Sequence, residues 1–249
     1  MAVASFCFHA ELNVFLARSK RQILIPHYFG EKASIKDMIE AFGVPHTEVD
    51  CIQVNDDFVD FSYIVKDGDK INIYPISASV ITPSVSVRPK PLSIIRFVLD
   101  IHLGKLATSL RLLGFDTLYR NDYNDEQLAE ISSSQLRILL TRDKGLLMRS
   151  LVTYGYYVRN TNPQEQIVEV LQRFDLFKLA SPFQRCLRCN GLLKPVTKES
   201  VIDDLPETVK SQNHEFHRCE NCHQIYWQGT HYERLEQFIE QVLDSRTSD

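Results

Sequence analysis

Residues 94–119 read IIRFVLDIHLGKLATSLRLLGFDTLY, and this stretch decides the fold of the central part of the chain. Its first run, IIRFVLD, is largely apolar and ends in Asp100, as expected of a strand that is buried on both faces. Apolar residues then recur at helical spacing from Leu103 to Leu113, and Gly114 is suited to end that helix. Because FDTLY (115–119) predicts a second strand, the stretch indicates a strand–helix–strand unit.

The alternation of strands and helices continues after this unit. Further strands are predicted at LRILLT (136–141) and YGYYVR (154–159). Helices are predicted at NDEQLAEISSSQ (124–135), KGLLMRSLV (144–152) and NPQEQIVEVLQRF (162–174). Such alternation is typical of a parallel sheet wrapped by helices, so we expect an α/β domain over residues 92–180.

A smaller domain of different composition precedes this one. Strands are predicted within residues 3–17 and 21–25, a helix at 34–42, and strands around 52–54, 58–61 and 70–76. Ser34 is expected to cap the helix and Gly43 to close it. Prolines and serines gather between residues 77 and 91, which is typical of an extended segment. We therefore place the first domain at residues 1–78 and a linker at 79–91.

The last part of the chain, residues 181–249, contains four cysteines in two pairs, followed by a helix predicted at ERLEQFIEQVL (233–243). The two-residue gap within each pair, Cys186–Cys189 and Cys219–Cys222, lets both thiolates bind one ion, and two pairs complete a tetrahedron. A redox pair or four ordinary thiols are the alternatives, but a redox pair is expected once rather than twice. The spacing favours a structural zinc site.

Acidic residues follow the predicted strands of the α/β domain. Asp100 and Asp143 end strands, and Asp122, Asp125 and Glu126 follow the strand at 115–119. The carboxyl ends of parallel strands line one crevice, where converging carboxylates favour Mg²⁺ or Mn²⁺. Ions held there could activate a water for attack on a phosphodiester. Simpler roles stay open, since Asp125 could be only a helix cap and Asp122 only a solvated loop residue.

Several basic and polar residues near these acids could contact a phosphate. Thr141 and Arg142 precede Asp143, and they could bind phosphate or serve only as a cap and an ion-pair partner. Lys105 and Arg111 lie on the helix that follows Asp100, where they could face substrate or solvent. The residues alone do not decide between these roles.

In combination, FVLDIHLGKLATSLRLLGFDTLYRNDYNDEQL and RILLTRDKGLL resemble the Mut-seven C-terminal ribonuclease family, a branch of the PIN-like nucleases. The resemblance implies a PIN-like domain that hydrolyses RNA with Mg²⁺ or Mn²⁺, usually with a double-CxxC zinc ribbon. It implies acidic roles for Asp100, Asp125 and Asp143, with Asp122 or Glu126 as a fourth acid. It also implies flanking roles for Arg111, Thr141 and Arg142. The ribbon would contact RNA through basic and aromatic residues: Arg185, Arg188, Lys194, Tyr226 and Trp227.

The first domain resembles the ubiquitin-like (β-grasp) domain that precedes such nucleases, on the residues FGVPHTEVD (42–50) and KDGDKINIYP (66–75). Sulfur-carrier relatives of that fold end in a free Gly-Gly, whereas this chain continues through YPISAS (74–79). We therefore expect a module that binds a protein partner or positions the nuclease domain, and the sulfur-transfer alternative is weaker.

Composition and charge limit the possible partners. Hydrophobic residues make up 44% of the 249 residues, which is ordinary for a globular protein. The first 78 residues carry seven Lys or Arg and eleven Asp or Glu, which accounts for the whole net charge of −4. RNA should therefore meet the later part of the chain.

The sequence contains neither a long apolar run nor a basic leader. We therefore expect no membrane association and a cytoplasmic location. Our hypothesis is a metal-dependent ribonuclease, and a catalytically weak or inactive RNA-binding adaptor is the alternative.

Overall fold

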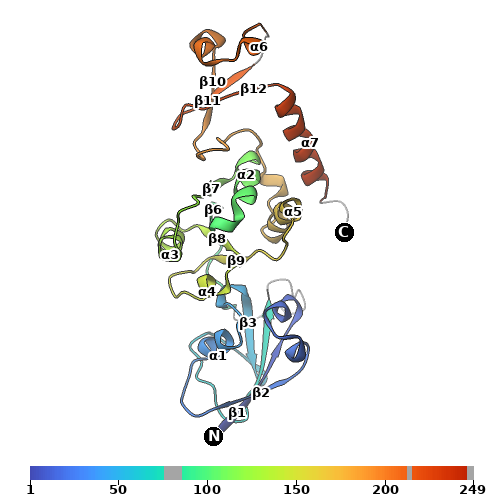
Figure 1. Ribbon diagram of the computed structural model, residues 1–249. Coiled ribbons are helices and arrows are strands. Elements are labelled where there is room, and N and C mark those ends of the chain that lie inside the picture. Colours follow the sequence, from blue (N-terminus) through green and yellow to red (C-terminus); the bar gives the residue numbers. More distant parts are fainter. Residues whose placement is uncertain (76–85, 212–214, 246–249) are drawn as a thin grey trace. The chain divides into compact units, whose positions relative to one another are not determined.

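The computed structural model describes residues 1–75, 86–211 and 215–245 (Figure 1). The chain forms two compact units, which we call unit 1 (residues 1–93 and 125–157) and unit 2 (residues 94–124 and 158–249). The linker predicted at 79–91 lies outside the described residues as far as residue 85. The predicted domain boundaries therefore stay predictions.

Unit 1 begins with a five-stranded sheet in the order β2-β1-β5-β3-β4, to which we refer as the β-grasp module (residues 1–75). Its strands are β1 (Ala2–Phe8), β2 (Ile25–Phe29), β3 (Val49–Val54), β4 (Asp57–Val59) and β5 (Lys70–Pro75). Strands β1 and β5 pair in parallel, with Phe6 opposite Ile71, and the other neighbours are antiparallel. The predicted β-grasp fold is confirmed.

Helix α1 (Ile35–Ala41) packs its apolar face on this sheet. Ser34 caps the helix as predicted, because its Oγ accepts a hydrogen bond from the Asp37 N–H at 3.2 Å. Gly43 follows the helix with φ +87°, the left-handed conformation that glycine adopts without strain. Ile35 and Ile39 are buried in the core beneath it.

The strand predicted within residues 3–17 was wrong beyond Phe8, and the strand predicted at 21–25 was wrong up to residue 24. Strand β1 ends at Phe8, and the chain continues as two 3₁₀ turns, η1 (Ala10–Phe15) and η2 (Arg18–Lys20). The Asn13 side chain holds this loop, donating to the carbonyls of Phe8 (2.7 Å) and Ala10 (3.0 Å). A side chain that bonds the local backbone in this way competes with strand pairing. Strand β2 therefore starts only at Ile25.

The second part of unit 1 contains two parallel strands and two helices. Strand β8 (Ile138–Thr141) pairs with β9 (Gly155–Tyr157), and they follow α3 (Asp125–Ser134) and α4 (Lys144–Leu147) respectively. The helix predicted at 144–152 is thus shorter than expected. All four residues of β8 are buried, as its apolar sequence predicts.

The β-grasp module packs against β9 through the short 3₁₀ turn η3 (His46–Glu48). Glu48 is only 2% exposed, and its Oε1 accepts a hydrogen bond from the Tyr157 N–H at 2.7 Å. His46 places Nδ1 2.6 Å from Glu40 Oε1 and Nε2 2.9 Å from the Val152 carbonyl oxygen. The ring of Phe15 meets the Tyr157 ring edge-on at 5.2 Å. This part of the nuclease region and the β-grasp module therefore share one packed interface.

The described end of the predicted linker is also packed. Val87 donates its N–H to the Asp50 carbonyl at 2.8 Å, and its side chain contacts the β-grasp core. Farther on, the Lys90 carbonyl accepts a hydrogen bond from the Tyr154 hydroxyl at 2.8 Å. Val87 and Lys90 of this segment are thus bonded to residues of unit 1.

Unit 2 contains the strand–helix–strand segment that the sequence predicts at residues 94–119. Strand β6 (Arg96–Leu99) pairs in parallel with β7 (Asp116–Leu118), and η4 (Ile101–Leu103) and α2 (Gly104–Leu112) connect them. Gly114 has φ +92°, and a Cβ there would lie 2.2 Å from the Ser181 carbonyl oxygen, so only glycine fits. The two parallel strand pairs and their helices confirm the α/β class.

Helix α5 (Pro163–Arg173) packs against α2 and is followed by the turn η5 (Phe177–Leu179). Its start is as predicted, with Pro163 in the first turn. Asn162 caps the helix by accepting from the Gln164 N–H at 2.8 Å. Ile167, Val170 and Leu171 form its buried face.

The rest of unit 2 is a small three-stranded antiparallel sheet, in the segment that we call the ribbon (residues 181–229). Its strands are β10 (Leu193–Val196), β11 (Phe216–Cys219) and β12 (Ile225–Trp227). Between β10 and β11 lie η6 (Lys198–Ser200), η7 (Ile202–Asp204) and α6 (Glu207–Lys210). Few apolar side chains are buried here, namely Val201, Leu205, Val209, Phe216 and Ile225.

The closing helix α7 (Thr230–Asp244) packs against α5. It is longer at its start than the predicted stretch at 233–243. A search of the described residues found no helix with both the length and the apolarity needed to span a bilayer.

Candidate metal centre and acidic residues

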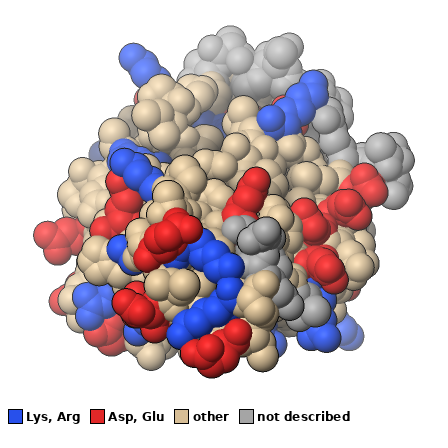
Figure 2. Space-filling view, turned by 90° about the horizontal axis from the view of Figure 1, so that it is seen from above, with Lys and Arg blue, Asp and Glu red and all other residues tan. Residues whose placement is uncertain are grey.

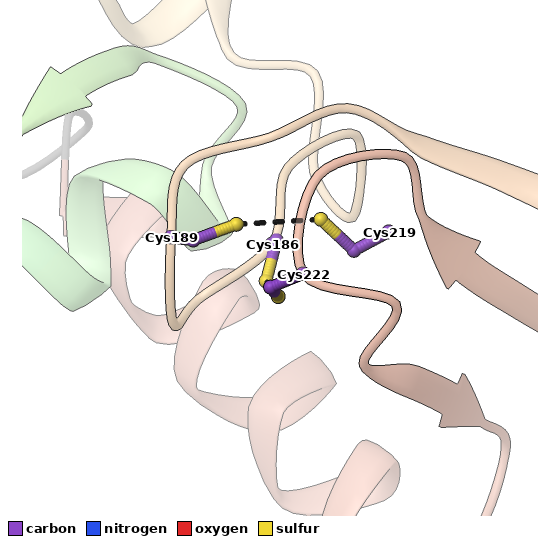
Figure 3. Close-up of side chains that lie close together, drawn as sticks. All are labelled: Cys186, Cys189, Cys219 and Cys222. Carbon is purple, nitrogen blue, oxygen red and sulfur yellow. Dashed lines mark hydrogen bonds between the residues drawn. The ribbon is translucent and has the colours of Figure 1, made fainter.

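Four cysteine side chains of the ribbon converge on one point (Figure 3). Their sulfur atoms all lie within 4.8 Å of one another, with 3.6 Å between Cys186 and Cys222 and 3.3 Å between Cys189 and Cys219. A tetrahedral zinc site with Zn–S bonds of ~2.3 Å places its sulfurs about 3.8 Å apart. The predicted clustering of the four cysteines is therefore confirmed, and the geometry fits a tetrahedral metal ion.

Each cysteine pair lies in a tight turn that ends in a left-handed residue. Asn190 follows the first pair with φ +70°, and His223 follows the second with φ +60°. In both turns the N–H of that residue donates to the carbonyl of the first cysteine of its pair, at 2.9 Å for Cys186 and 3.1 Å for Cys219. These turns direct both thiols of a pair to the same side.

Gly191 allows the two turns to approach each other. A Cβ at this position would lie 2.8 Å from the Cys219 sulfur, which is closer than real Cβ atoms come. The glycine that follows the first pair in the sequence is therefore explained by the close approach of the second pair.

Hydrogen bonds to Cys186 favour its thiolate. Burial alone would raise the pKa of this thiol, but the Tyr226 hydroxyl at 3.1 Å and the backbone N–H groups of Cys189 and Arg188 lower the pKa to about 7. Burial raises the pKa of Cys189 to about 12. Metal binding requires all four cysteines as thiolates, so binding would release protons mainly from the thiols with raised pKa.

A buried arginine joins helix α2 to the first cysteine turn. Arg111 is 4% exposed and donates from Nη1 to the carbonyls of Leu187 (3.0 Å) and Arg188 (3.1 Å). Its Nε donates to the Thr117 carbonyl at 3.0 Å. Burial lowers the pKa of the guanidinium, and the nearby thiolates of Cys186 and Cys189 oppose that shift. Arg111 was predicted to contact substrate, but its hydrogen bonds go to backbone carbonyls that connect α2, β7 and the first cysteine turn.

Two further side chains connect the ribbon to strand β7. Asn190 accepts from the Thr117 N–H at 2.9 Å and donates to Asp116 Oδ1 at 2.8 Å. Arg185 donates to the Gly114 carbonyl at 3.1 Å and to the Asn190 carbonyl at 3.0 Å. Side chains next to the first cysteine turn therefore bond the backbone of Gly114 and of Thr117, the residues that flank Phe115 and Asp116. The sequence analysis missed Asn190, although a residue directly after a CxxC pair is a candidate for a left-handed turn.

The acidic residues occupy the ends of strands and the starts of helices, as predicted. In unit 2, Asp100 directly follows β6, is 6% exposed, and accepts from the His102 N–H at 2.9 Å. In unit 1, Asp143 follows β8, and its Oδ1 accepts from the N–H groups of Gly145 (2.7 Å) and Leu146 (3.3 Å). Its own N–H donates to Thr141 Oγ1 at 2.9 Å.

Two other acids lie beside arginines. Asp125, the first residue of α3, has an oxygen 3.7 Å from Arg149 Nη2. Asp122 accepts two hydrogen bonds from Arg120, at 2.9 and 2.6 Å, and both side chains are largely exposed. Because Asp100 belongs to one unit and Asp125 and Asp143 to the other, a shared acidic site stays a prediction.

The remaining predicted contacts differ in exposure. Lys105 is exposed on α2, Arg142 is half-buried, and Thr141 is fully buried. In the ribbon, Lys194 pairs with Glu220 at 2.6 Å, and Arg188 is exposed. Basic and acidic side chains are interleaved on the face shown in Figure 2.

The fold and the cysteine cluster define a class of protein: an α/β chain with a β-grasp module at one end and a four-cysteine ribbon at the other. Comparison with family models gives a match to the Mut7-C RNAse domain over residues 95–239 and to the Mut7-C ubiquitin domain over residues 1–81. The chain therefore belongs to the Mut7-C RNAse domain family, as the sequence motifs predicted. No curated protein and no solved structure matched the chain significantly.

Proposed function

We propose that this chain is a metal-dependent ribonuclease in which Asp100, Asp125 and Asp143 hold Mg²⁺ or Mn²⁺. The observation that carries the proposal is the match to the Mut7-C RNAse domain, since the matched residues include all three aspartates. Two of them directly follow parallel strands, and Asp125 begins the helix after β7. Carboxylate oxygens are the ligands that these hard cations prefer.

The chain's own residues would prepare this site in different ways. Asp143 uses Oδ1 to accept two backbone N–H groups, which fixes the carboxylate, and no described residue bonds its Oδ2. Asp100 is held by the His102 N–H in a buried position, where its charge calls for a partner. The ions, when bound, would supply the charge that activates water and stabilises the phosphorane-like transition state. Lys105 and Arg142 are proposed to contact phosphates.

We also infer that the cysteine cluster binds zinc and has a structural role. Four thiolates fill a tetrahedral ion and leave no position for substrate or water. Chemistry would therefore belong to the aspartates, and the ribbon would support the domain and contact RNA. The β-grasp module, fixed through Glu48 and His46, is proposed to bind a protein partner or to position the nuclease region.

A cleavage assay tests the proposal. Labelled single-stranded and structured RNAs would be incubated with the zinc-loaded protein and Mn²⁺, beside the Asp143→Asn variant. Asparagine keeps the capping oxygen at residue 143 but removes its charge, so we expect a roughly 100-fold or greater loss of rate with the fold retained. Asp203→Asn, an exposed aspartate in η7, is the matched control and should cleave normally. Cleavage that survives Asp143→Asn would refute the assignment.

A second candidate is an RNA-binding adaptor without catalysis. The observation that favours it is the arginine beside each of two acids, Arg149 near Asp125 and Arg120 on Asp122, since a guanidinium can replace a metal as the counter-charge. Binding of RNA with no cleavage of any substrate, in Mg²⁺ or Mn²⁺, would favour this reading over the enzyme.

A further inference from the structure

A cavity of about 560 Å³ lies between the ribbon and the start of helix α7, beside the cysteine cluster. Its size falls within the roughly 300–1,000 Å³ of typical ligand sites. All of its lining residues belong to unit 2, and four of them are aromatic. These are Phe183, Tyr226, Trp227 and Tyr232.

The aromatic rings are held in place by their surroundings. Phe183 and Tyr232 stack with their centroids 4.4 Å apart and an interplanar angle of 23°. The Tyr226 hydroxyl lies 3.1 Å from the Cys186 sulfur and accepts from the Leu187 N–H at 3.0 Å, so this ring is anchored to the first cysteine turn. Trp227 packs in part against the ribbon core, and the cavity faces the rest of its side chain. Part of the wall is therefore formed by aromatic rings whose positions are fixed by their neighbours.

Two histidines provide hydrogen-bonding groups at the cavity. His217 of β11 and His231 of α7 line it, and no described residue forms a hydrogen bond with either ring. Arg185 also lines the cavity, but its Nε and Nη1 donate to the carbonyls of Gly114 and Asn190, and its Nη2 lies 3.9 Å from Asp116 Oδ2, so its charge already faces a carboxylate. The cavity thus offers stacking surfaces and imidazole nitrogens, and its guanidinium is already paired with Asp116.

The aromatic rings and histidines of the cavity favour some classes of ligand over others. A phosphate would need an uncommitted cation, and the arginine of the cavity is engaged. A flat, uncharged heterocycle with polar edges needs aromatic faces and a few hydrogen-bonding groups, which the cavity has. Stacking also needs no extended basic surface, in keeping with the interleaved charges of Figure 2.

We propose that the cavity lined by Trp227, Tyr232 and His217 binds an unpaired nucleobase of single-stranded RNA. The choice of RNA as the source of the base rests on the proposed ribonuclease function. The site would hold one nucleotide of the substrate by stacking, and its connection to Cys186 through Tyr226 would make it depend on an intact metal site.

Tryptophan fluorescence gives a direct test, because Trp227 is the only tryptophan of the chain. Oligouridylate and oligoadenylate would be titrated into the full-length, zinc-loaded protein without Mg²⁺ or Mn²⁺, beside an abasic ribose-phosphate oligomer of equal length. We expect saturable quenching by the oligomers with bases and little by the abasic one. Equal quenching by the abasic oligomer, or quenching by none, would overturn the proposal.

Variants localise the binding. Tyr232→Leu removes a stacking face and should weaken binding roughly 5- to 100-fold, since one stacked base contributes that much. His217→Ala changes only a polar edge and tests the cavity should Tyr232→Leu fail to fold. Tyr28→Leu, at an exposed tyrosine of β2, is the matched control and should bind normally. Unchanged affinity in both cavity variants would contradict the assignment.

The same titration separates this proposal from the ribonuclease proposal. In Asp143→Asn, quenching of Trp227 should persist while cleavage is lost. Quenching without cleavage of any RNA would sink the ribonuclease and keep the base site. Cleavage that depends on Asp143, with no base-dependent quenching, would support the ribonuclease proposal and reject the base site.

Discussion

The β-grasp module and the ribbon each contact a neighbouring strand through a side chain that accepts a backbone N–H, and an arginine of α2 adds a donor to the ribbon's attachment. In unit 1 the carboxylate of Glu48 accepts the Tyr157 N–H of β9. In unit 2 the guanidinium of Arg111 donates to the Thr117 carbonyl of β7, and Asn190 accepts the N–H of the same residue. Strand backbones that lack a neighbouring strand expose such groups, and the side chains of Glu48, Asn190 and Arg111 bond them here.

The difference lies in what holds each side chain in place. Glu48 stands on a turn that is supported by the apolar core of a complete five-stranded sheet. The turn that contains Leu187, Arg188 and Asn190 is supported instead by the cysteine cluster, because the ribbon buries few apolar side chains. One attachment therefore depends on packing and the other on the cysteine cluster, which we propose holds zinc.

Removal of zinc should have the largest effect and should act on one attachment only. A chelator, or Cys219→Ser, would leave uncompensated thiols and a small core, and structural zinc sites contribute on the order of 10 kcal/mol. Hydrogen exchange should show lost protection in β10, β11 and β12 and unchanged protection in β1 and β5. Retained protection of β11 after verified zinc loss would show that the ribbon folds without the ion.

Arg111→Met should have the next largest effect. It leaves the buried Thr117 carbonyl and the partly buried carbonyls of Leu187 and Arg188 without their donor, which should cost about 2–4 kcal/mol of unfolding free energy. Urea unfolding of the zinc-saturated protein would measure this cost. Lys105→Met, at an exposed position of the same helix, is the control and should change stability by less than about 0.5 kcal/mol. Equal stability of the two variants would make Arg111 dispensable to the attachment.

The sequence predicts those structural features that depend on residues close together in the chain. The CxxC spacing, the cap at Ser34 and the glycine at 114 each depend on neighbouring residues, and all three are as expected. Residues 9–17 were assigned wrongly because their apolar alternation resembles a strand, whereas the Asn13 side chain bonds the backbone around it. Alternation alone cannot show such a competitor.

Arg111 shows a second limit. Its position, four residues after Ala107, places it at the margin of the buried stripe of α2, where a long side chain can turn inward. That spacing is a usable signal, but its partners lie on the distant cysteine turn, which periodicity does not reveal. The acidic site has the same difficulty, since its members would meet only through the arrangement of strands that are far apart in sequence.

Substitutions of Glu48 should have the smallest effect on stability. They also separate the contribution of its charge from that of its hydrogen bond. Glu48→Ala leaves the Tyr157 N–H without its acceptor and should cost about 1–3 kcal/mol, whereas Glu48→Gln keeps an oxygen and should recover most of that loss. Urea unfolding and the exchange rate of the Tyr157 amide would measure both, with Glu31→Ala as an exposed control in the same module. Were Gln as damaging as Ala, the carboxylate charge would be the essential feature. Were neither to change the Tyr157 amide, packing alone, including the Phe15–Tyr157 ring contact, would hold the β-grasp module.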